Sequence, residues 1–248
     1  MSDYEYFREN NLIKSIYDDK ELIEKVKDQI KRMKDNPPER SYNNIESWFN
    51  YENDVSSITI GSKTIMNCDP LKIFAILAEV DVMNKFVQRF DSIEKLEELT
   101  LFRWIIRIRI KMPITIDNRE VVCIGFGFVD PVDKTIFLPF RSINKDHYSH
   151  LSTPAEDQSF KRIEINYGFF HLKILGKDTV EVINCYNVDP KVPVIPWMIL
   201  NTFLKEISYY IMVDLKKQIL DADFGLYEER IKKNQHFYDA LFNKVYEK

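Results

Sequence analysis

Residues 188–220 read VDPKVPVIPWMILNTFLKEISYYIMVDLKKQIL, and this stretch decides the fold. Asp189 and the prolines at 190 and 193 interrupt the preceding segment, whereas Pro196 suits the first turn of a helix. Because neither Gly nor Pro occurs in residues 197–220, we expect one long uninterrupted helix there.

Apolar residues recur along this helix at spacings of three and four, which places them on one face. They are Trp197, Leu200, Leu204, Ile207, Ile211, Leu215 and Ile219, with Asn201 and Ser208 beside them. A second apolar side is formed by Ile199, Phe203, Tyr210 and Val213. A helix that is apolar nearly all round is buried, so it is either a packed core helix or the cover of a hollow lined by a sheet.

The whole chain has 248 residues and 45% hydrophobic content, enough for one large domain with a sizeable core. Its net charge of −4, with both signs mixed, argues against nucleic-acid binding through phosphate neutralisation. The three cysteines are far apart, which suggests neither a disulfide framework nor a metal site. The polar N-terminus and the short apolar runs indicate no secretion signal or membrane span, so we expect a cytoplasmic protein.

The first half of the chain suggests helices on either side of two strands. Residues 20–34 carry a narrow apolar stripe after Asp18 and Asp19, as in an amphipathic surface helix. A first strand is expected within 41–53 and a second at 55–66. Asp69 followed by Pro70 is a typical helix start, which predicts a helix to about Val80.

Between Ser92 and Asp189 the hydrophobic period changes to two, which predicts several antiparallel strands. In residues 102–111 apolar side chains alternate with Arg103, Arg107, Arg109 and Lys111, so we expect these bases on a solvated sheet face. The element order predicts an α+β domain whose curved antiparallel sheet grips the long helix. Residues 226–245 have helical spacing and are expected to pack as an amphipathic appendix, against the outer apolar side of the long helix or, alternatively, on a membrane or partner.

Few residues suggest catalysis. His147 and His150 lie in a polar loop and would need further ligands to hold a metal, while His171 on a strand is expected to be solvated. The segment from Arg119 to Val129 is apolar on both faces and contains Gly125 and Gly127, which permit a bulge or leave room for a ligand. Cys123 reads as a small apolar lining residue, and neither a metal nor another cofactor is expected.

Arg119 and Glu120 open this apolar strand, and two interpretations remain open. They form a strand-end ion pair that faces water, or they place charge at the mouth of an apolar hollow. In the second case they would orient the head group of an amphipathic ligand.

Two segments resemble the START domains, the lipid-transfer modules of helix-grip fold. Lys111-Met112-Pro113 followed by Asn118-Arg119-Glu120 resembles the K-x-P-x4-N-R-[DE] segment of the phosphatidylcholine transfer protein branch. Ile195-Pro196-Trp197 resembles the start of that family's C-terminal helix, and the element order agrees.

The resemblance implies a START-like lipid-binding domain at residues 1–220 and an extension at 221–248. It implies one lipid enclosed between sheet and helix, transient membrane contact and, on our reading, a monomer. Sterol-binding members carry an Arg six residues after the motif Arg; here that position is Gly125, which favours a phospholipid. The expected ligand-binding residues are Arg119, Glu120, Val121, Cys123, Gly125, Gly127, Trp197, Leu200, Asn201, Leu204, Ile207, Ser208 and Ile211.

Two alternatives stay open. A helix-grip enzyme of the cyclase or hydrolase kind would need an acid or base in the hollow, and Cys123, Asn201 and Ser208 are the candidates that can be named. An interaction scaffold would instead have a filled core and no ligand. Since one fold hosts many functions, the lipid-transfer expectation depends on the site itself.

Overall fold

The structure is a computed structural model that describes residues 11–51, 57–85, 90–112, 117–189, 191, 197–221 and 224–246. Side chains are described throughout these ranges except at 11–13, 51, 84–85, 197–205, 207, 208 and 221.

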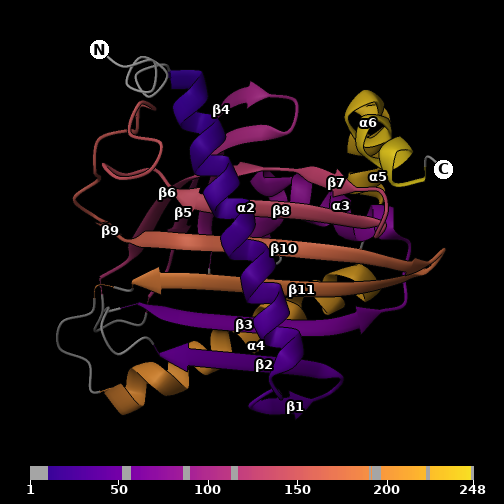
Figure 1. Cartoon of the computed structure of the whole chain (residues 1–248), viewed down its shortest axis with the longest axis horizontal. Helices are drawn as coiled ribbons and strands as arrows, with labels where there is room; N and C mark the ends of the chain where they lie inside the picture. The colour runs from indigo at the N-terminus through magenta and orange to yellow at the C-terminus, as the bar shows by residue number, and fades with distance from the viewer. Residues whose placement is uncertain are drawn as a thin grey trace.

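A large curved antiparallel sheet forms the centre of the molecule (Figure 1). Its strands are β1 Arg40–Tyr42, β2 Ile45–Tyr51, β3 Ile58–Met66, β4 Phe90–Thr100, β5 Arg103–Ile110, β6 Arg119–Phe126, β7 Phe128–Asp130, β8 Thr135–Ser142, β9 Lys161–Arg162, β10 Glu164–Gly176 and β11 Thr179–Asp189. The strand order is β1-β2-β3-β11-β10-β8-β6-β5-β4, with β7 beside β8 and β9 parallel to β6.

Helices cover both faces of this sheet. They are α2 Asn11–Asp35, α3 Pro70–Ala78, the 3-10 turn η1 Val80–Lys85, α4 Trp197–Asp221, α5 Gly225–Lys233 and α6 Gln235–Tyr246. Helix α2 crosses the near face in Figure 1, which we call the outer face, and contacts β8 and β10. Helix α4 lies behind β2 and β3, on what we call the inner face. The α+β, helix-grip arrangement expected from the sequence is therefore confirmed, including the long helix.

Local sequence explains several element boundaries. Asn43 and Asn44 join β1 to β2 with φ of 50° and 59°, and Asn is one of the few residues that adopt this left-handed conformation readily. Asp69 caps α3 as predicted, since its carboxylate accepts a hydrogen bond from the Leu71 backbone N–H at 2.9 Å. None of the described helices combines the length and hydropathy that a bilayer-crossing segment needs.

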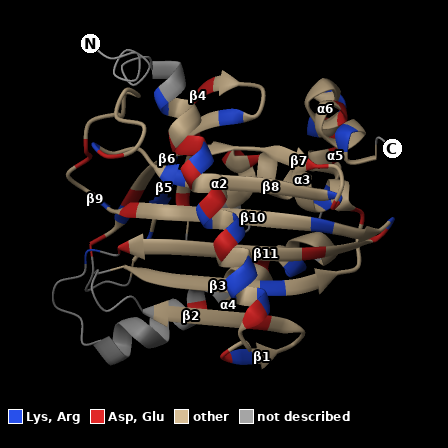
Figure 2. Ribbon diagram, viewed as in Figure 1, with Lys and Arg blue, Asp and Glu red and all other residues tan. Residues whose placement is uncertain are grey.

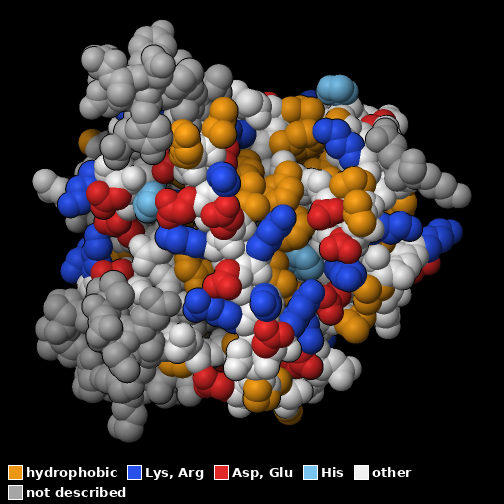
Figure 3. Space-filling model, viewed as in Figure 1, with side chains coloured by type: hydrophobic (Ala, Val, Ile, Leu, Met, Phe, Trp, Pro, Cys, Tyr) orange, Lys and Arg blue, Asp and Glu red, His pale blue; other side chains and the backbone are white. Residues whose placement is uncertain are grey.

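The outer face has a tightly packed core under α2. Four residues spaced along the helix pack on four of the sheet: Leu22, Val26, Ile30 and Met33 meet Phe137, Phe169, Ile183 and Cys185. A Cβ at Gly61 would come within 2.9 Å of the Met33 methyl group, so glycine permits this close approach of helix and strand. Acidic and basic side chains interleave along the exposed side of α2 (Figures 2 and 3).

Two sequence expectations about this face are wrong. Helix α2 begins at Asn11 rather than after Asp19, so Asp18 and Asp19 lie within it and bind the sheet and a loop instead of marking a helix start. Likewise Arg103, Arg107 and Arg109 do not form a merely solvated face, because each is partly buried and pairs with a carboxylate.

His171 was also expected to be solvated, yet only 4% of it is exposed. It lies edge-on to Phe137, with a ring-centroid separation of 4.8 Å. Burial, followed by the charges of Lys34 and Lys173, lowers the pKa of His171 to about 4. The sequence interpretation assumed that His171 is solvated because it lies on the same side of the strand as Lys173. In the structure His171 is buried, whereas Lys173 remains partly exposed.

This burial predicts a pH dependence of stability. Between about pH 6.5 and 4 the unfolded chain binds a proton that the folded His171 refuses, so this stability is present above pH 6.5 and is lost as the pH falls. From pH 7 to 5 the loss should be about 2 kcal/mol. Urea unfolding of wild type and His171→Phe at both pH values checks this. Equal losses in the two proteins would show that His171 does not contribute.

The C-terminal helices belong to the largest hydrophobic cluster, which also contains residues of α3, α4 and the sheet. Phe237 of α6 stacks on Phe74 of α3 and on Trp104 of β5. Arg230 of α5 donates hydrogen bonds to Glu79 and to Asp81. The appendix therefore packs as expected but against α3 and the sheet, beside β7, rather than along the outer side of α4.

Candidate ligand-binding face

The candidate site is the inner face of the sheet. Side chains alternate between the two faces along each strand, and the register aligns those of neighbouring strands. In β6, Val121, Cys123 and Gly125 point to the inner face, with Cys123 opposite Ile106 of β5 and Ser142 of β8. This face is mostly apolar, as the resemblance implied.

Both faces of the sheet carry some apolar side chains that are fully buried and some that are only partly buried. On the outer face, Phe169 and Cys185 are fully buried under α2. On the inner face, Phe140, Phe170 and Tyr186 keep part of their surface accessible although they lie on central strands. Burial nevertheless raises the pKa of Tyr186 above its usual value, so this tyrosine lies deep in the protein. Apolar side chains thus line the inner face without being packed throughout.

Arg119 stands at one end of this face. It shares the parity of Val121 and Cys123, lies opposite Ile110, and is only 3% exposed. Its guanidinium donates a hydrogen bond to the backbone oxygen of Asp117. Burial lowers the pKa of Arg119, and the nearby Asp117 charge only partly offsets this. The sheet therefore brings a buried cation to the edge of an apolar surface.

Glu120 follows Arg119 directly and points to the opposite face. Its carboxylate accepts hydrogen bonds from Arg162 at 2.5 Å and from Arg109 at 3.2 Å, and it is 1% exposed. Arg109 is bound in turn by Asp157 at 3.0 Å. The two charged residues that the sequence grouped together thus serve different faces, and Glu120 joins β5, β6 and β9 through ion pairs.

The remaining β6 candidates have distinct surroundings. Burial raises the pKa of the Cys123 thiol to about 12, which keeps it protonated and unsuited to nucleophilic attack. A Cβ at Gly125 would lie 3.5 Å from the Cβ of Phe140, an ordinary contact, so the position would accept an alanine without displacement of its neighbours. A Cβ at Gly127 would lie 3.3 Å from Leu138 and 3.9 Å from Leu241, so this glycine accommodates α6 instead.

Most of the ligand-binding residues expected on α4 have side chains that the structure does not describe. They are Trp197, Leu200, Asn201, Leu204, Ile207 and Ser208. In the described half of the helix, Tyr209, Met212 and Leu215 are buried in the main cluster. Ile211, which the sequence placed on the pocket side, is half-buried and lies next to this core stripe.

Comparison with known proteins rests on structure, since neither a family model nor a curated protein sequence matches this chain. Human STARD10 superposes with a TM-score of 0.66 and 15% identity, covering 84% of this chain and 80% of its own. Human StAR-related lipid transfer protein 5 superposes with a TM-score of 0.68 and 11% identity, covering 80% of this chain and 94% of its own. The protein has the START fold. A STAR-related lipid transfer protein fragment from Xanthomonas axonopodis superposes with a TM-score of 0.57 and 13% identity, covering 73% of this chain and 96% of its own.

Within the START fold, the segment that carried the sequence resemblance connects β5 to β6. Residues 113–116 lie outside the described chain, but both ends of the connection are described. The Met112 backbone N–H donates to the side-chain oxygen of Asn118 at 3.1 Å, which links the residues after β5 to the residue just before Arg119. The motif thus has a structural role, which is to fix where Arg119 enters the inner face.

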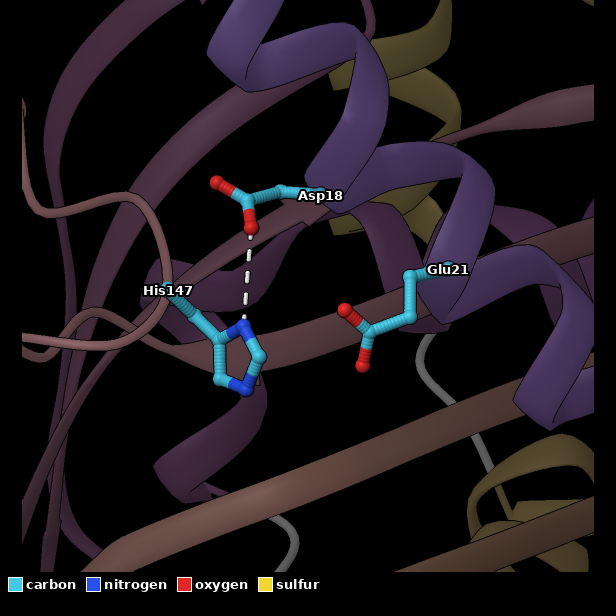
Figure 4. Close-up of side chains that lie close together, drawn as sticks. All are labelled: Asp18, Glu21 and His147. Atoms are coloured by element: carbon cyan, nitrogen blue, oxygen red, sulfur yellow. Dashed lines mark hydrogen bonds and ion pairs between the residues drawn. The ribbon is translucent and has the colours of Figure 1, made fainter. Parts of the chain in front are cut away.

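A polar network on the outer face was missed by the sequence analysis. Asp18 and Glu21 of α2 lie beside His147 of the loop between β8 and β9 (Figure 4), and Asp18 is 3.5 Å from the His147 ring. Glu21 accepts from Arg141 at 3.1 Å. Burial raises the pKa of Glu21, but hydrogen bonds from Lys25 and Arg141 outweigh this and lower it to about 2. Although these three residues could offer ligand atoms to a metal, each already has a protein partner. We therefore assign them the structural role of holding the loop against α2.

Proposed function

We propose that the protein binds a single lipid on the inner face and carries it between membranes without a catalytic step. The observation that carries this proposal is Arg119, a buried cation at the end of the apolar inner face of β6 and its neighbouring strands. Each acyl CH₂ group removed from water contributes about 0.8 kcal/mol to binding. The similar START-fold structures are named as lipid transfer proteins, which agrees with this function.

A phospholipid suits the site better than a sterol. A guanidinium binds a phosphate through paired, charge-assisted hydrogen bonds, and Arg119 brings a guanidinium to the apolar inner face. Gly125, six residues further along β6, offers no second cation on the same face. The protonated Cys123 supplies no nucleophile, which supports carriage rather than chemistry.

Exchange of the lipid requires the inner face to open. Helix α4 covers β2 and β3, so its displacement at a membrane surface would expose the apolar lining. The contact with the membrane would be transient, and we propose that the protein works as a cytoplasmic monomer that does not bind nucleic acid.

Substitution of Arg119 tests the head-group role. Arg119→Met preserves the length of the side chain but removes its charge, and we expect transfer of fluorescent phosphatidylcholine between vesicles to fall roughly ten- to a hundredfold. Arg107→Met, on the outer face of the neighbouring strand, is the matched control. Unchanged transfer by a folded Arg119→Met protein would refute the phosphate contact.

A further inference from the structure

A group of polar side chains interrupts the apolar inner face beneath α4. It consists of Ser47 on β2, Ser62 on β3, and Asn184 and Tyr186 on β11, and we call it the polar row. The register places Ser47 opposite Ser62, and Ser62 opposite Asn184. Tyr186 is two residues from Asn184 and so lies on the same face.

Hydrogen bonds link three members of the polar row. The Ser62 hydroxyl donates to the Asn184 side-chain oxygen at 2.5 Å, and the Asn184 amide donates to the Tyr186 hydroxyl at 3.2 Å. Because this bond uses the Tyr186 oxygen as acceptor, the tyrosine's own hydroxyl hydrogen remains to donate. The Ser47 hydroxyl is buried and has no hydrogen-bond partner among the residues that the structure describes.

An unpaired hydroxyl in an apolar surface costs free energy unless a ligand or water satisfies it. The members of the polar row are uncharged, so their hydrogen bonds would not offset the free-energy cost of removing an ionic group from water. A neutral hydroxyl suits them, since it can accept from Tyr186 and exchange a hydrogen bond with Ser47.

The polar row is remote from Arg119. Tyr186 aligns with Gly168, Phe140 and Gly125 across β10, β8 and β6. Arg119 is six residues from Gly125 along β6, about 20 Å at the usual rise per residue. A lipid whose phosphate binds Arg119 would therefore reach the polar row with its acyl chain rather than with its head group.

We propose that the polar row selects lipids that carry a hydroxyl group on an acyl chain, and this inference rests on the lipid binding proposed above. An ordinary saturated or unsaturated chain would leave the Ser47 hydroxyl without a partner and the Tyr186 hydroxyl hydrogen without an acceptor. A hydroxylated chain would supply a partner for each.

The test uses two phosphatidylcholines that differ in one hydroxyl. The full-length protein is incubated with vesicles containing equal amounts of the palmitoyl-oleoyl and palmitoyl-ricinoleoyl forms, then reisolated, and its bound lipids are quantified by mass spectrometry. We expect about fivefold enrichment of the hydroxylated lipid, the effect of one hydrogen bond.

Two conservative variants locate the effect. Ser47→Ala and Tyr186→Phe each remove one oxygen. Each should bring the ratio of bound hydroxylated to bound ordinary lipid closer to one, with the total amount of bound lipid unchanged. Ile106→Val changes the apolar lining on β5, opposite Cys123 and away from the polar row, and should preserve the enrichment. Thermal melting confirms that each variant is folded.

The outcomes separate the two proposals. Equal uptake of both lipids by wild type, or enrichment that survives in both hydroxyl variants, would overturn selection by the polar row while leaving lipid carriage intact. Uptake of neither lipid would overturn the proposed function on which it rests.

Discussion

Replacing Phe237 with alanine is expected to lower the free energy of unfolding by about 3–5 kcal/mol. Phe237 is buried where α6 meets the sheet, and its ring contacts those of Phe74, Phe102, Trp104 and Tyr238. Such aromatic contacts add to the area that the ring buries. Chemical denaturation monitored by circular dichroism measures the effect.

The matched control is Asp239→Ala, an exposed position on the same helix that should change stability by less than about 0.5 kcal/mol. If Phe237→Ala cost no more than this control, α6 would be a dispensable appendix rather than part of the core.

Replacing Glu120 with alanine should also cost about 3–5 kcal/mol, because Arg109 and Arg162 would lose their shared, buried carboxylate. Only 1% of the Glu120 side chain is exposed, so its ion pairs are largely shielded from solvent. The same denaturation measurement applies, together with identification of the bound lipid in each protein.

Glu94→Ala is the control, since the Glu94–Arg107 pair joins neighbouring strands but Glu94 is 41% exposed. This variant should lose less than about 1 kcal/mol. A Glu120→Ala protein of normal stability that bound a different lipid would instead assign Glu120 to the head group, which is one of the two interpretations that the sequence left open.

Short-range patterns predicted much of this fold. The helix after Pro196 and the strand around Cys123 were visible because burial imposes a period on the sequence. The Asp69 cap was visible because a single residue and its proline neighbour suffice to define it. Arg119 was visible as a charged residue at the start of an apolar strand, and it also belongs to the motif that resembles the START domains.

Contacts between distant segments could not be predicted in the same way. The burial of His171 depends on where α2 crosses β10, and the position of Phe237 depends on how the chain returns after α4. The polar row joins Ser47 to Asn184 through strand register, which no local pattern encodes. Glu120 and Arg119 were grouped together because adjacency in sequence hides that successive strand residues face opposite sides.

The central claim is that the inner face holds one lipid, and native mass spectrometry of the purified full-length chain tests it most directly. Denaturing extraction then identifies whatever is bound. The account predicts a mass increase equal to one phospholipid per chain. A protein that is free of lipid when purified, and stays so after incubation with mixed liposomes, would contradict it.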